Sequence, residues 1–244
     1  MGGAKTLVLL VRHGHTPTTG KVLPGRAEGL ELSEKGQEQA IHAGERIIKL
    51  VDSVISAGAR GEKESMAASH RTTPIIYASP MLRTQQTALP IAASCGVEVT
   101  TLEGINECDF GDWTGAELAE LRKLPEWKTV QETPSKFAFP GGESFAGMQE
   151  RAVGAIGDVV GRHPGGIIVA VSHADVIKSI VADAMGTPLD HFQKLFISPC
   201  SISAVVYESV SHPSDKNKTA MVLTANSIGD DLGRLPIRLG GEDA

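Results

Sequence analysis

The sequence predicts an α/β protein, a three-layer α/β/α sandwich around a mostly parallel sheet. Two continuous apolar runs of strand length, residues 7–11 and 167–171, predict strands that are buried on both faces. Segments of this kind alternate along the chain with longer stretches of helical period, as in sheets covered by helices. The 244 residues, 21% of them charged, suit a globular protein, and we expect residues 1–244 to form a single domain.

A strand and a helix open the chain. Residues 6–11 form an unbroken run of Thr, Val and Leu, which predicts the first strand. Ser33 stands where a helix N-cap belongs, and apolar residues at helical spacing after it predict a helix over residues 34–52. Residues 57–73 are polar and aperiodic. We therefore expect a mobile surface excursion there.

Two further strands follow, with a helix between them. Residues 74–78 are apolar and predict the second strand. Ser79 and Pro80 have the pattern of an N-cap followed by proline in the first helical turn, and this helix is expected to run to about Cys95. Residues 97–102 alternate between apolar and polar types and predict a third strand.

The middle of the chain is less regular. Between residues 103 and 142 the pattern predicts only short helical pieces, around residues 115–123 and 125–131. From Glu143 onward, apolar residues at helical spacing predict one amphipathic helix that ends before Pro164.

The last part returns to the alternation of strand and helix. The run at 167–171 predicts a buried strand, and residues 175–185 predict a helix. Residues 201–207 and 220–225 predict two final strands, and a flexible Gly-rich tail is expected from about residue 227.

Charge and composition exclude several function classes. Lys and Arg number 23 against 29 Asp and Glu, so no basic excess exists to bind a nucleic acid backbone. The longest apolar runs have five residues, far from the roughly 20 that a membrane helix needs. The three cysteines, Cys95, Cys108 and Cys200, lack a Cys-x-x-Cys spacing. We therefore expect a cytoplasmic protein without nucleic acid or membrane partners.

The residues that follow the predicted strands are the candidates for a site, because ligands of such sheets bind at the carboxyl ends of strands. Four strand ends carry two arginines, two histidines and a carboxyl group: Arg12, His13, Arg83, Glu107 and His173. Arginines clamp phosphate oxygens, an imidazole can attack phosphorus, and a carboxylic acid can protonate the leaving oxygen. This set predicts phosphoryl transfer without a metal or other cofactor. No His-x-His or His-Glu-x-x-His spacing supports a metal site.

Five segments in order carry a further likeness: Arg12-His13-Gly14, Ser79-Pro80-x-x-Arg83-x-x-Gln86-Thr87-Ala88, Asn106-Glu107, Pro140-Gly141-Gly142-Glu143-Ser144 and Ser172-His173. With them the chain resembles, over nearly its whole length, the histidine phosphatase superfamily, which contains cofactor-dependent phosphoglycerate mutase and many broad phosphatases. The stretches 24–29 and 173–178 are similar to an actinobacterial subgroup of probable phosphomutases.

The resemblance implies a role for each core residue. His13 is the nucleophile that becomes phosphorylated, and Glu107 is the proton donor and later the base. Arg12, Arg83 and His173 form the phosphate pocket. An imidazole with a pKa of about 6.5 is mostly neutral and nucleophilic at neutral pH. We expect His173 to stay protonated beside a phosphate dianion, with backbone N–H groups of a helix start adding to the attraction.

Four more residues complete the predicted pocket: Thr16, Thr19, Arg26 and Ala174. Thr16 either donates to phosphate or stabilises a turn, and Arg26 either reaches the substrate or lies outside its reach. Thr19 and Ala174 depart from the family pattern, in which an asparagine is common at the first of these positions. His15 places an extra imidazole at the mouth of the site. These departures concern substrate preference rather than the chemistry.

The leading interpretation is a metal-independent phosphomonoesterase that acts through a phosphohistidine on a small phosphorylated metabolite, as a monomer or homodimer. The alternative is a phosphoglycerate mutase-type phosphomutase, and a third possibility is a phosphate-binding module without catalysis. A mutase needs a substantial lid with basic residues. Between Trp113 and Pro140 the chain offers only a short segment with four of them, Arg122, Lys123, Lys128 and Lys136, so hydrolysis is favoured.

Overall fold

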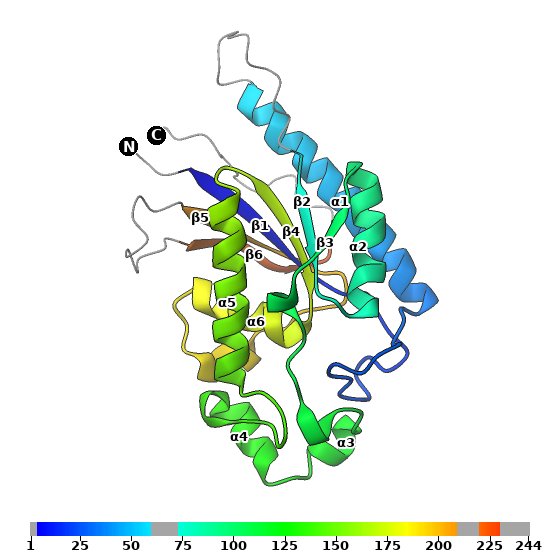
Figure 1. The fold of residues 1–244 in the computed structure, drawn as a ribbon, viewed down its shortest axis with the longest axis vertical. Coiled ribbons are helices and arrows are strands. Elements are labelled where there is room, and N and C mark those ends of the chain that lie inside the picture. Colours follow the sequence, from blue (N-terminus) through cyan, green and yellow to red (C-terminus); the bar gives the residue numbers. More distant parts are fainter. Residues whose placement is uncertain (1–3, 60–72, 209–219, 230–244) are drawn as a thin grey trace.

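A six-stranded sheet with helices on both faces forms the centre of the protein (Figure 1). The computed structural model describes residues 4–59, 73–208 and 220–229. The strands are β1 (Lys5–Arg12), β2 (Ile75–Ala78), β3 (Val99–Thr101), β4 (Ile167–Ser172), β5 (Ile202–Glu208) and β6 (Ala220–Ser227). They lie in the order β3-β2-β4-β1-β5-β6. Only β5 runs against its neighbours, so the predicted mostly parallel sheet is confirmed.

Two pairs of long helices cover the two faces of the sheet. The helices are α1 (Glu34–Ala59), α2 (Leu82–Cys95), α3 (Leu118–Leu121), α4 (Glu126–Glu132), α5 (Phe145–Arg162) and α6 (Ala174–Ala184). Short 3-10 turns are η1 (Glu103–Ile105), η2 (Gly111–Trp113), η3 (Pro134–Lys136) and η4 (Leu189–Lys194). Helices α1 and α2 pack on one face, and α5 and α6 pack on the other (Figure 1). The three-layer architecture is the predicted one.

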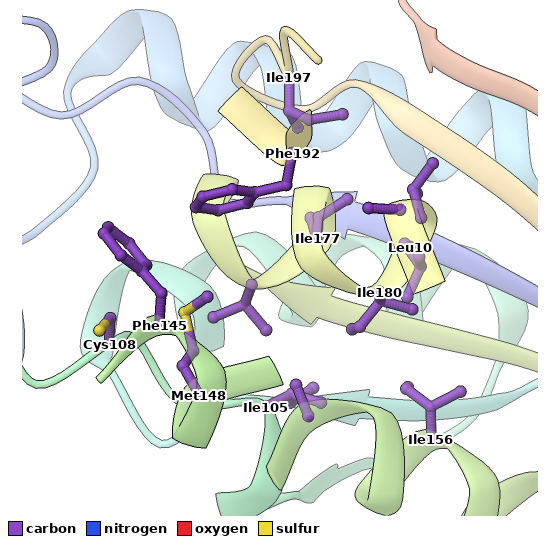
Figure 2. Packing of buried hydrophobic residues seen from close by; sticks show 14 of the residues in the cluster. Leu10, Ile105, Cys108, Phe145, Met148, Ile156, Ile177, Ile180, Phe192 and Ile197 are labelled. Carbon is purple, nitrogen blue, oxygen red and sulfur yellow. The ribbon is translucent and has the colours of Figure 1, made fainter. Parts of the chain in front are cut away.

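Residues 7–11 of β1 are all apolar because both faces of the strand are buried. Leu7 and Leu9 belong to the core cluster under α1 and α2, whereas Val8 and Leu10 belong to the cluster under α5 and α6. Figure 2 shows the second cluster, in which side chains such as Ile177 of α6 lie near Leu10. Full burial of an aliphatic side chain contributes about 1.5–3 kcal/mol, so a strand with two buried faces anchors both layers.

The helix α1 is longer than predicted. It continues to Ala59 because Val54 extends the apolar stripe past residue 52 and packs partly against the α1/α2 core. Residues 57–59 of the expected surface excursion are therefore helical. Residues 60–72 of that excursion, and the expected tail from residue 230 onward, lie outside the described residues.

The helix α2 begins later than predicted. Its N-cap is Met81, which has an extended backbone (ψ 139°) and makes no side-chain cap hydrogen bond. Ser79 and Pro80 therefore precede the helix instead of starting it. The Ser79 hydroxyl instead lies 2.7 Å from a histidine at another strand end, described below.

The irregular segment between β3 and α5 is fixed by packed aromatic rings. Phe139 lies at the centre of this group, with ring centroids 4.8 Å from Phe110, 4.9 Å from Phe137 and 5.1 Å from Phe145. Trp113 is the fourth ring around Phe139, at a centroid distance of 5.5 Å. Rings at these separations pack favourably edge to face. The loop after β3 therefore has a defined position despite its lack of long helices.

None of the helices in the described ranges is long and apolar enough to span a membrane.

Candidate active site

The carboxyl ends of β1, β2 and β4 lie side by side, because β1 and β2 both pair with β4 in parallel. Arg12 ends β1 in register with Ser172, the last residue of β4. His13 and His173 follow at these neighbouring strand ends, and their ring centroids are 5.4 Å apart. The register of two strands thus brings together residues that are far apart in the sequence.

Arg83 and Glu107 join the two histidines. Arg83 lies at the start of α2, after β2, and Glu107 lies on the loop after η1. Nη2 of Arg83 lies 3.2 Å from Nδ1 of His173. Oε2 of Glu107 is 3.5 Å from that nitrogen and 3.8 Å from Nη2 of Arg83. The structure therefore places the predicted catalytic residues at one edge of the sheet.

His13 is held with one nitrogen available for attack. The carbonyl oxygen of Gly14 lies 2.8 Å from Nδ1, so we assign the proton to Nδ1, which leaves the lone pair on Nε2. Burial and then the charges of Arg83 and Arg12 place the pKa of His13 well below its ordinary value. A neutral imidazole with a free Nε2 is the nucleophilic form.

The residue after this histidine must be glycine for packing reasons. A Cβ on Gly14 would lie 2.5 Å from the carbonyl oxygen of Gly36 in α1. The Gly14 N–H donates to Oγ1 of Thr87, and Thr87 donates to the Arg83 carbonyl oxygen. The turn after His13 is therefore tied to the same stretch of α2 that carries Arg83.

The two arginines offer several buried hydrogen-bond donors that no other described residue accepts. Arg83 is fully buried, and Nη2 donates to the carbonyl oxygen of Gly25 at 2.8 Å. Its Nε and Nη1, and Nε of Arg12, are buried and have no hydrogen-bond partner among the residues that the structure describes. Nη1 of Arg12 donates to the carbonyl oxygen of Ile197 at 2.6 Å. Burial lowers the pKa of both groups from its ordinary value, yet guanidinium remains charged at neutral pH. Unmatched donors on buried cations form a site for an oxyanion.

Glu107 is buried in a way that suits a proton donor. Its exposed fraction is 7%, and Oε1 accepts a hydrogen bond from the Cys108 N–H at 3.0 Å. Burial raises the pKa of Glu107 to about 7, although the charge of Arg83 acts in the opposite direction. The carboxyl group is thus partly protonated near neutral pH, as a general acid requires.

His173 is oriented by a chain of hydrogen bonds. Its Nε2 lies 2.7 Å from Oγ of Ser79, and Ser79 donates to Oδ1 of Asn106 at 3.4 Å. Nε2 therefore carries a proton, while Nδ1 accepts from Arg83. Burial and then the charge of Arg83 place the pKa of His173 well below its ordinary value. His173 is neutral in the protein alone, and the expected protonated state requires the charge of a bound dianion. As expected, it lies at the start of a helix, at the N-cap of α6.

The predicted binding residues have more varied surroundings. Oγ1 of Thr16 lies 3.0 Å from Oγ1 of Thr19, and the Thr16 N–H donates to the same hydroxyl, so both residues stabilise the turn after His15. The His15 ring lies 2.9 Å from the Ser33 hydroxyl through Nδ1. Ala174 is the first residue of α6 and packs partly against the core.

A group of charged residues, of which only Arg151 was not singled out in the sequence, fixes the loop of Glu107. Nε of Arg26 donates to the carbonyl oxygen of Glu107 at 2.8 Å. Arg151 of α5 donates to the carbonyl oxygens of Gly104 and Asn106 at 2.8 and 3.1 Å. Oε2 of Glu143 lies 3.2 Å from Arg26 and 2.9 Å from Arg151. We name Arg26, Glu143 and Arg151 the loop clamp.

The electrostatics of the loop clamp favour its ionised form. Burial by itself would raise the pKa of Glu143, but the hydrogen bond and charge of Arg151 outweigh burial and lower it. Glu143 belongs to the Pro140–Ser144 segment, which the sequence analysis identified as part of the family pattern. Arg151 lies about two helical turns further along the chain, and no sequence pattern pointed to it. Its partners are carbonyl groups of a distant loop, and these have no sequence signature.

The loop clamp predicts an effect on turnover from a residue that does not touch the reacting atoms. Arg151→Gln removes the donors to the Glu107 loop, and because small misplacements are costly, we expect kcat to fall by about 10²-fold. We also expect the pH profile of the remaining activity to shift, because the position of Glu107 changes. The measurement is kcat against pH. Arg162→Gln, on the same helix but bonded to Asp158 of its own turn, is the control and should keep wild-type kcat. Equal kcat in both variants would contradict the role of the clamp.

A cavity of about 430 Å³ lies beside Glu107. It is lined by Arg26, Glu28, Gly29, Pro80, Met81, Leu82 and Asn106. Within the described ranges, no three His, Cys, Asp or Glu side chains are grouped so that they could hold a metal ion.

The sequence of the chain is similar to those of phosphatases and phosphoglycerate mutases. The sequence model of the histidine phosphatase superfamily (branch 1) matches residues 59–213, a span that contains Arg83, Glu107 and His173 and begins after His13. Phosphoserine phosphatase 1 of Hydrogenobacter thermophilus is 31% identical over 206 residues, which cover 82% of this chain and 86% of that protein. A probable phosphoglycerate mutase, GpmB of Cronobacter sakazakii, is 30% identical over 205 residues, 82% of this chain and 85% of that protein.

Solved structures share the fold. A mycobacterial glucosyl-3-phosphoglycerate phosphatase superposes with a TM-score of 0.71 at 21% identity, over 91% of this chain and 99% of that chain. A protein described as mycobacterial hydrolase 2 superposes with a TM-score of 0.75 at 21% identity, over 95% and 96% of the two chains. The superposed spans take in most of the sheet and helices described above.

Proposed function

Because the chain belongs to the histidine phosphatase superfamily and is an enzyme of that family, we propose that it hydrolyses phosphomonoesters of a small metabolite through a phosphohistidine at His13. One observation carries the proposal: a neutral His13 lies beside Arg83 and Arg12, whose buried donors include several with no partner among the described residues. We infer that Arg12, Arg83 and His173 bind the phosphoryl group and that Glu107 transfers the proton.

In the first half of the reaction, the phosphoryl group moves to the enzyme. Its oxygens accept hydrogen bonds from Arg12 and Arg83, whose fixed charges stabilise the developing negative charge. Nε2 of His13 attacks phosphorus, and the bond from phosphorus to the leaving oxygen breaks. Glu107 in its protonated form gives that oxygen a proton, so the product leaves as an alcohol.

In the second half, water takes the place of the leaving alcohol. Glu107 is now a carboxylate and accepts a proton from the water as its oxygen attacks phosphorus. The bond from phosphorus to Nε2 of His13 breaks, and inorganic phosphate leaves. A single carboxyl group thus serves both steps, which its pKa of about 7 allows.

The surroundings of the basic residues before α5 support hydrolysis over mutase activity. Lys123 pairs with Glu120 and Lys128 with Glu132, each within its own short segment, and the exposed fractions of the two lysines are 69% and 76%. None of the residues that line the cavity is a lysine. These lysines are therefore poor candidates for holding a substrate carboxylate within a closed site, as a mutase requires.

A panel of phosphorylated metabolites tests the proposal directly. We expect release of inorganic phosphate, with no isomerised phosphate ester among the products. Products can be followed by phosphate assay and phosphorus NMR on the same samples. An isomerised ester formed faster than free phosphate would identify the enzyme as a mutase instead.

Metal independence is a second expected property. Arg12 and Arg83 already supply the positive charge that a divalent ion supplies in metal-dependent phosphatases. Activity should therefore survive exhaustive treatment with a chelator. A loss of about tenfold or more that magnesium or zinc restores would show that a metal takes part.

The wider setting of the enzyme also belongs to the proposal. We place it in the cytoplasm because its cysteines, Cys95, Cys108 and Cys200, are unpaired, as in a reducing compartment. We propose one domain over residues 1–244, a monomer or homodimer as the active form, and a small phosphorylated metabolite rather than nucleic acid as the partner.

A further inference from the structure

We propose that the leaving group of the natural substrate carries no carboxylate, so that the enzyme prefers phosphomonoesters of neutral or cationic alcohols to those of hydroxy acids. This inference rests on the proposed phosphatase function and names the substrate class of the same site. It is carried by the position and the charges of the 430 Å³ cavity, which we name the leaving-group cavity.

The cavity borders the loop that carries Glu107. The proton donor has to reach the leaving oxygen, so the leaving group lies on the Glu107 side of the phosphate. Asn106 lines the cavity and accepts the N–H of Glu107 through Oδ1 at 2.8 Å. Arg26 lines it too and donates to the carbonyl oxygen of Glu107. Pro80, a third wall residue, follows Ser79, which orients His173. The cavity volume lies within the range of about 300–1,000 Å³ that is usual for small-molecule sites.

The cation in the wall of the cavity is already neutralised. Nη2 of Arg26 lies 3.2 Å from Oε2 of Glu143, and Nη1 lies 3.8 Å from Oδ2 of Asp109. Arg151 shares Glu143 with it, so two arginines face two carboxylates and the group has no net charge. Nε of Arg26 is used by the carbonyl oxygen of Glu107. Among the residues that line the cavity, Arg26 is the sole cation.

Glu28 adds a negative charge to this wall. It is exposed, and it forms no ion pair with any residue in the described ranges. A substrate carboxylate in the cavity would lie near Glu28, and the one cation among the described lining residues, Arg26, is already paired with Glu143 and Asp109. Such like-charge contacts weaken the binding of a ligand, and they do so less at an open wall than where water is excluded. Hydroxyl or ammonium groups would instead donate to Glu28.

The remaining walls suit a carbon skeleton. Pro80, Met81 and Leu82 supply apolar surface at the start of α2, and the exposed fraction of Leu82 is 37%. The cavity thus combines an apolar side with a carboxylate. That combination fits an alcohol such as a polyol or an amino alcohol.

Two matched pairs of substrates test this inference. Glycerol 3-phosphate and 3-phosphoglycerate differ in a hydroxymethyl group against a carboxylate, and phosphoethanolamine and phosphoglycolate differ in an aminomethyl group against a carboxylate. We expect kcat/KM to be higher by about tenfold or more for the member without the carboxylate in each pair. Equal values, or higher values for the carboxylates, would overturn the inference.

A variant links the preference to the cavity. Glu28→Gln should raise kcat/KM for the carboxylates and narrow the ratio within each pair. Glu31→Gln, an exposed glutamate on the same segment that does not line the cavity, should leave the ratio unchanged. An unchanged ratio in Glu28→Gln would overturn the assignment of the cavity. Nitrophenyl phosphate is assayed in parallel: if the wild-type protein does not hydrolyse it, the proposed phosphatase function fails and not the substrate preference.

Discussion

His13→Ala is expected to abolish turnover, with kcat for nitrophenyl phosphate falling by roughly 10³–10⁶-fold, as when a covalent nucleophile is removed from other hydrolases. The reason is specific to this site. Nδ1 of His13 donates to the Gly14 carbonyl oxygen, and only Nε2 has the lone pair that can reach phosphorus. His173, 5.4 Å away between ring centroids, cannot replace it, because its Nε2 is bonded to Ser79 and its Nδ1 to Arg83.

The chemical form of the intermediate gives an independent measurement. A phosphoenzyme trapped by rapid denaturation should be labile in acid and stable in alkali, as a phosphoramidate is, and peptide mapping should place it on His13. His15→Ala is the matched control, because this neighbouring imidazole is bonded to Ser33 through Nδ1 and should not affect labelling. A label on any other residue, or wild-type kcat in His13→Ala, would refute the mechanism.

The sequence indicated the positions of the two proposed catalytic histidines well, because His13 and His173 each directly follow a strand with a buried apolar run. In β1 and β4, burial on both faces forces continuous apolar runs, and the polar residues directly after such runs mark the strand ends. The parallel register of β1 and β4 then places His13 and His173 side by side. Apolar runs thus indicate the strands, and the polar residues directly after them indicate where the site lies.

Other features depend on contacts between distant segments and leave no local pattern. Ser79 has the sequence context of an N-cap, but its hydroxyl contacts His173, and α2 begins only at Leu82. Arg151 lies on an ordinary amphipathic helix, and only the fold shows that it binds the carbonyl groups before Glu107. The protonation of Glu107 is likewise a result of burial, which residue identity alone does not reveal.

Glu107→Gln is expected to separate substrates by their need for a proton. Nitrophenolate is stable as an anion and leaves without protonation, whereas an alkoxide from glycerol does not. General acid catalysis typically contributes about 10²–10⁴-fold, so the phosphorylation step should slow by this factor for glycerol 3-phosphate and far less for nitrophenyl phosphate. Single-turnover measurements are needed, because loss of the base slows dephosphorylation for both substrates.

The pH dependence gives the same test a second readout. The pKa of Glu107 is raised to about 7, so the fraction of protonated acid falls as the pH rises through that value. In the wild-type enzyme the phosphorylation rate with glycerol 3-phosphate should therefore decrease above about pH 7. The neutral amide of Glu107→Gln does not titrate, so this decrease should be absent in the variant, while the arginines still hold the phosphate.

Two results would mean that another group donates the proton. One is an equal loss of phosphorylation rate for the two substrates, and the other is a decrease of this rate at high pH that persists in Glu107→Gln. Asp109 and Asp112 on the same loop would then be the alternatives. Asp109 is the weaker fit on structural grounds, because its side chain has an exposed fraction of 43% and accepts the Gly111 N–H at 3.1 Å. Glu107 is buried against Arg83 and His173, the residues that we propose to bind the phosphoryl group. A proton donor must lie within reach of the leaving oxygen on that group, and this proximity makes Glu107 the stronger candidate.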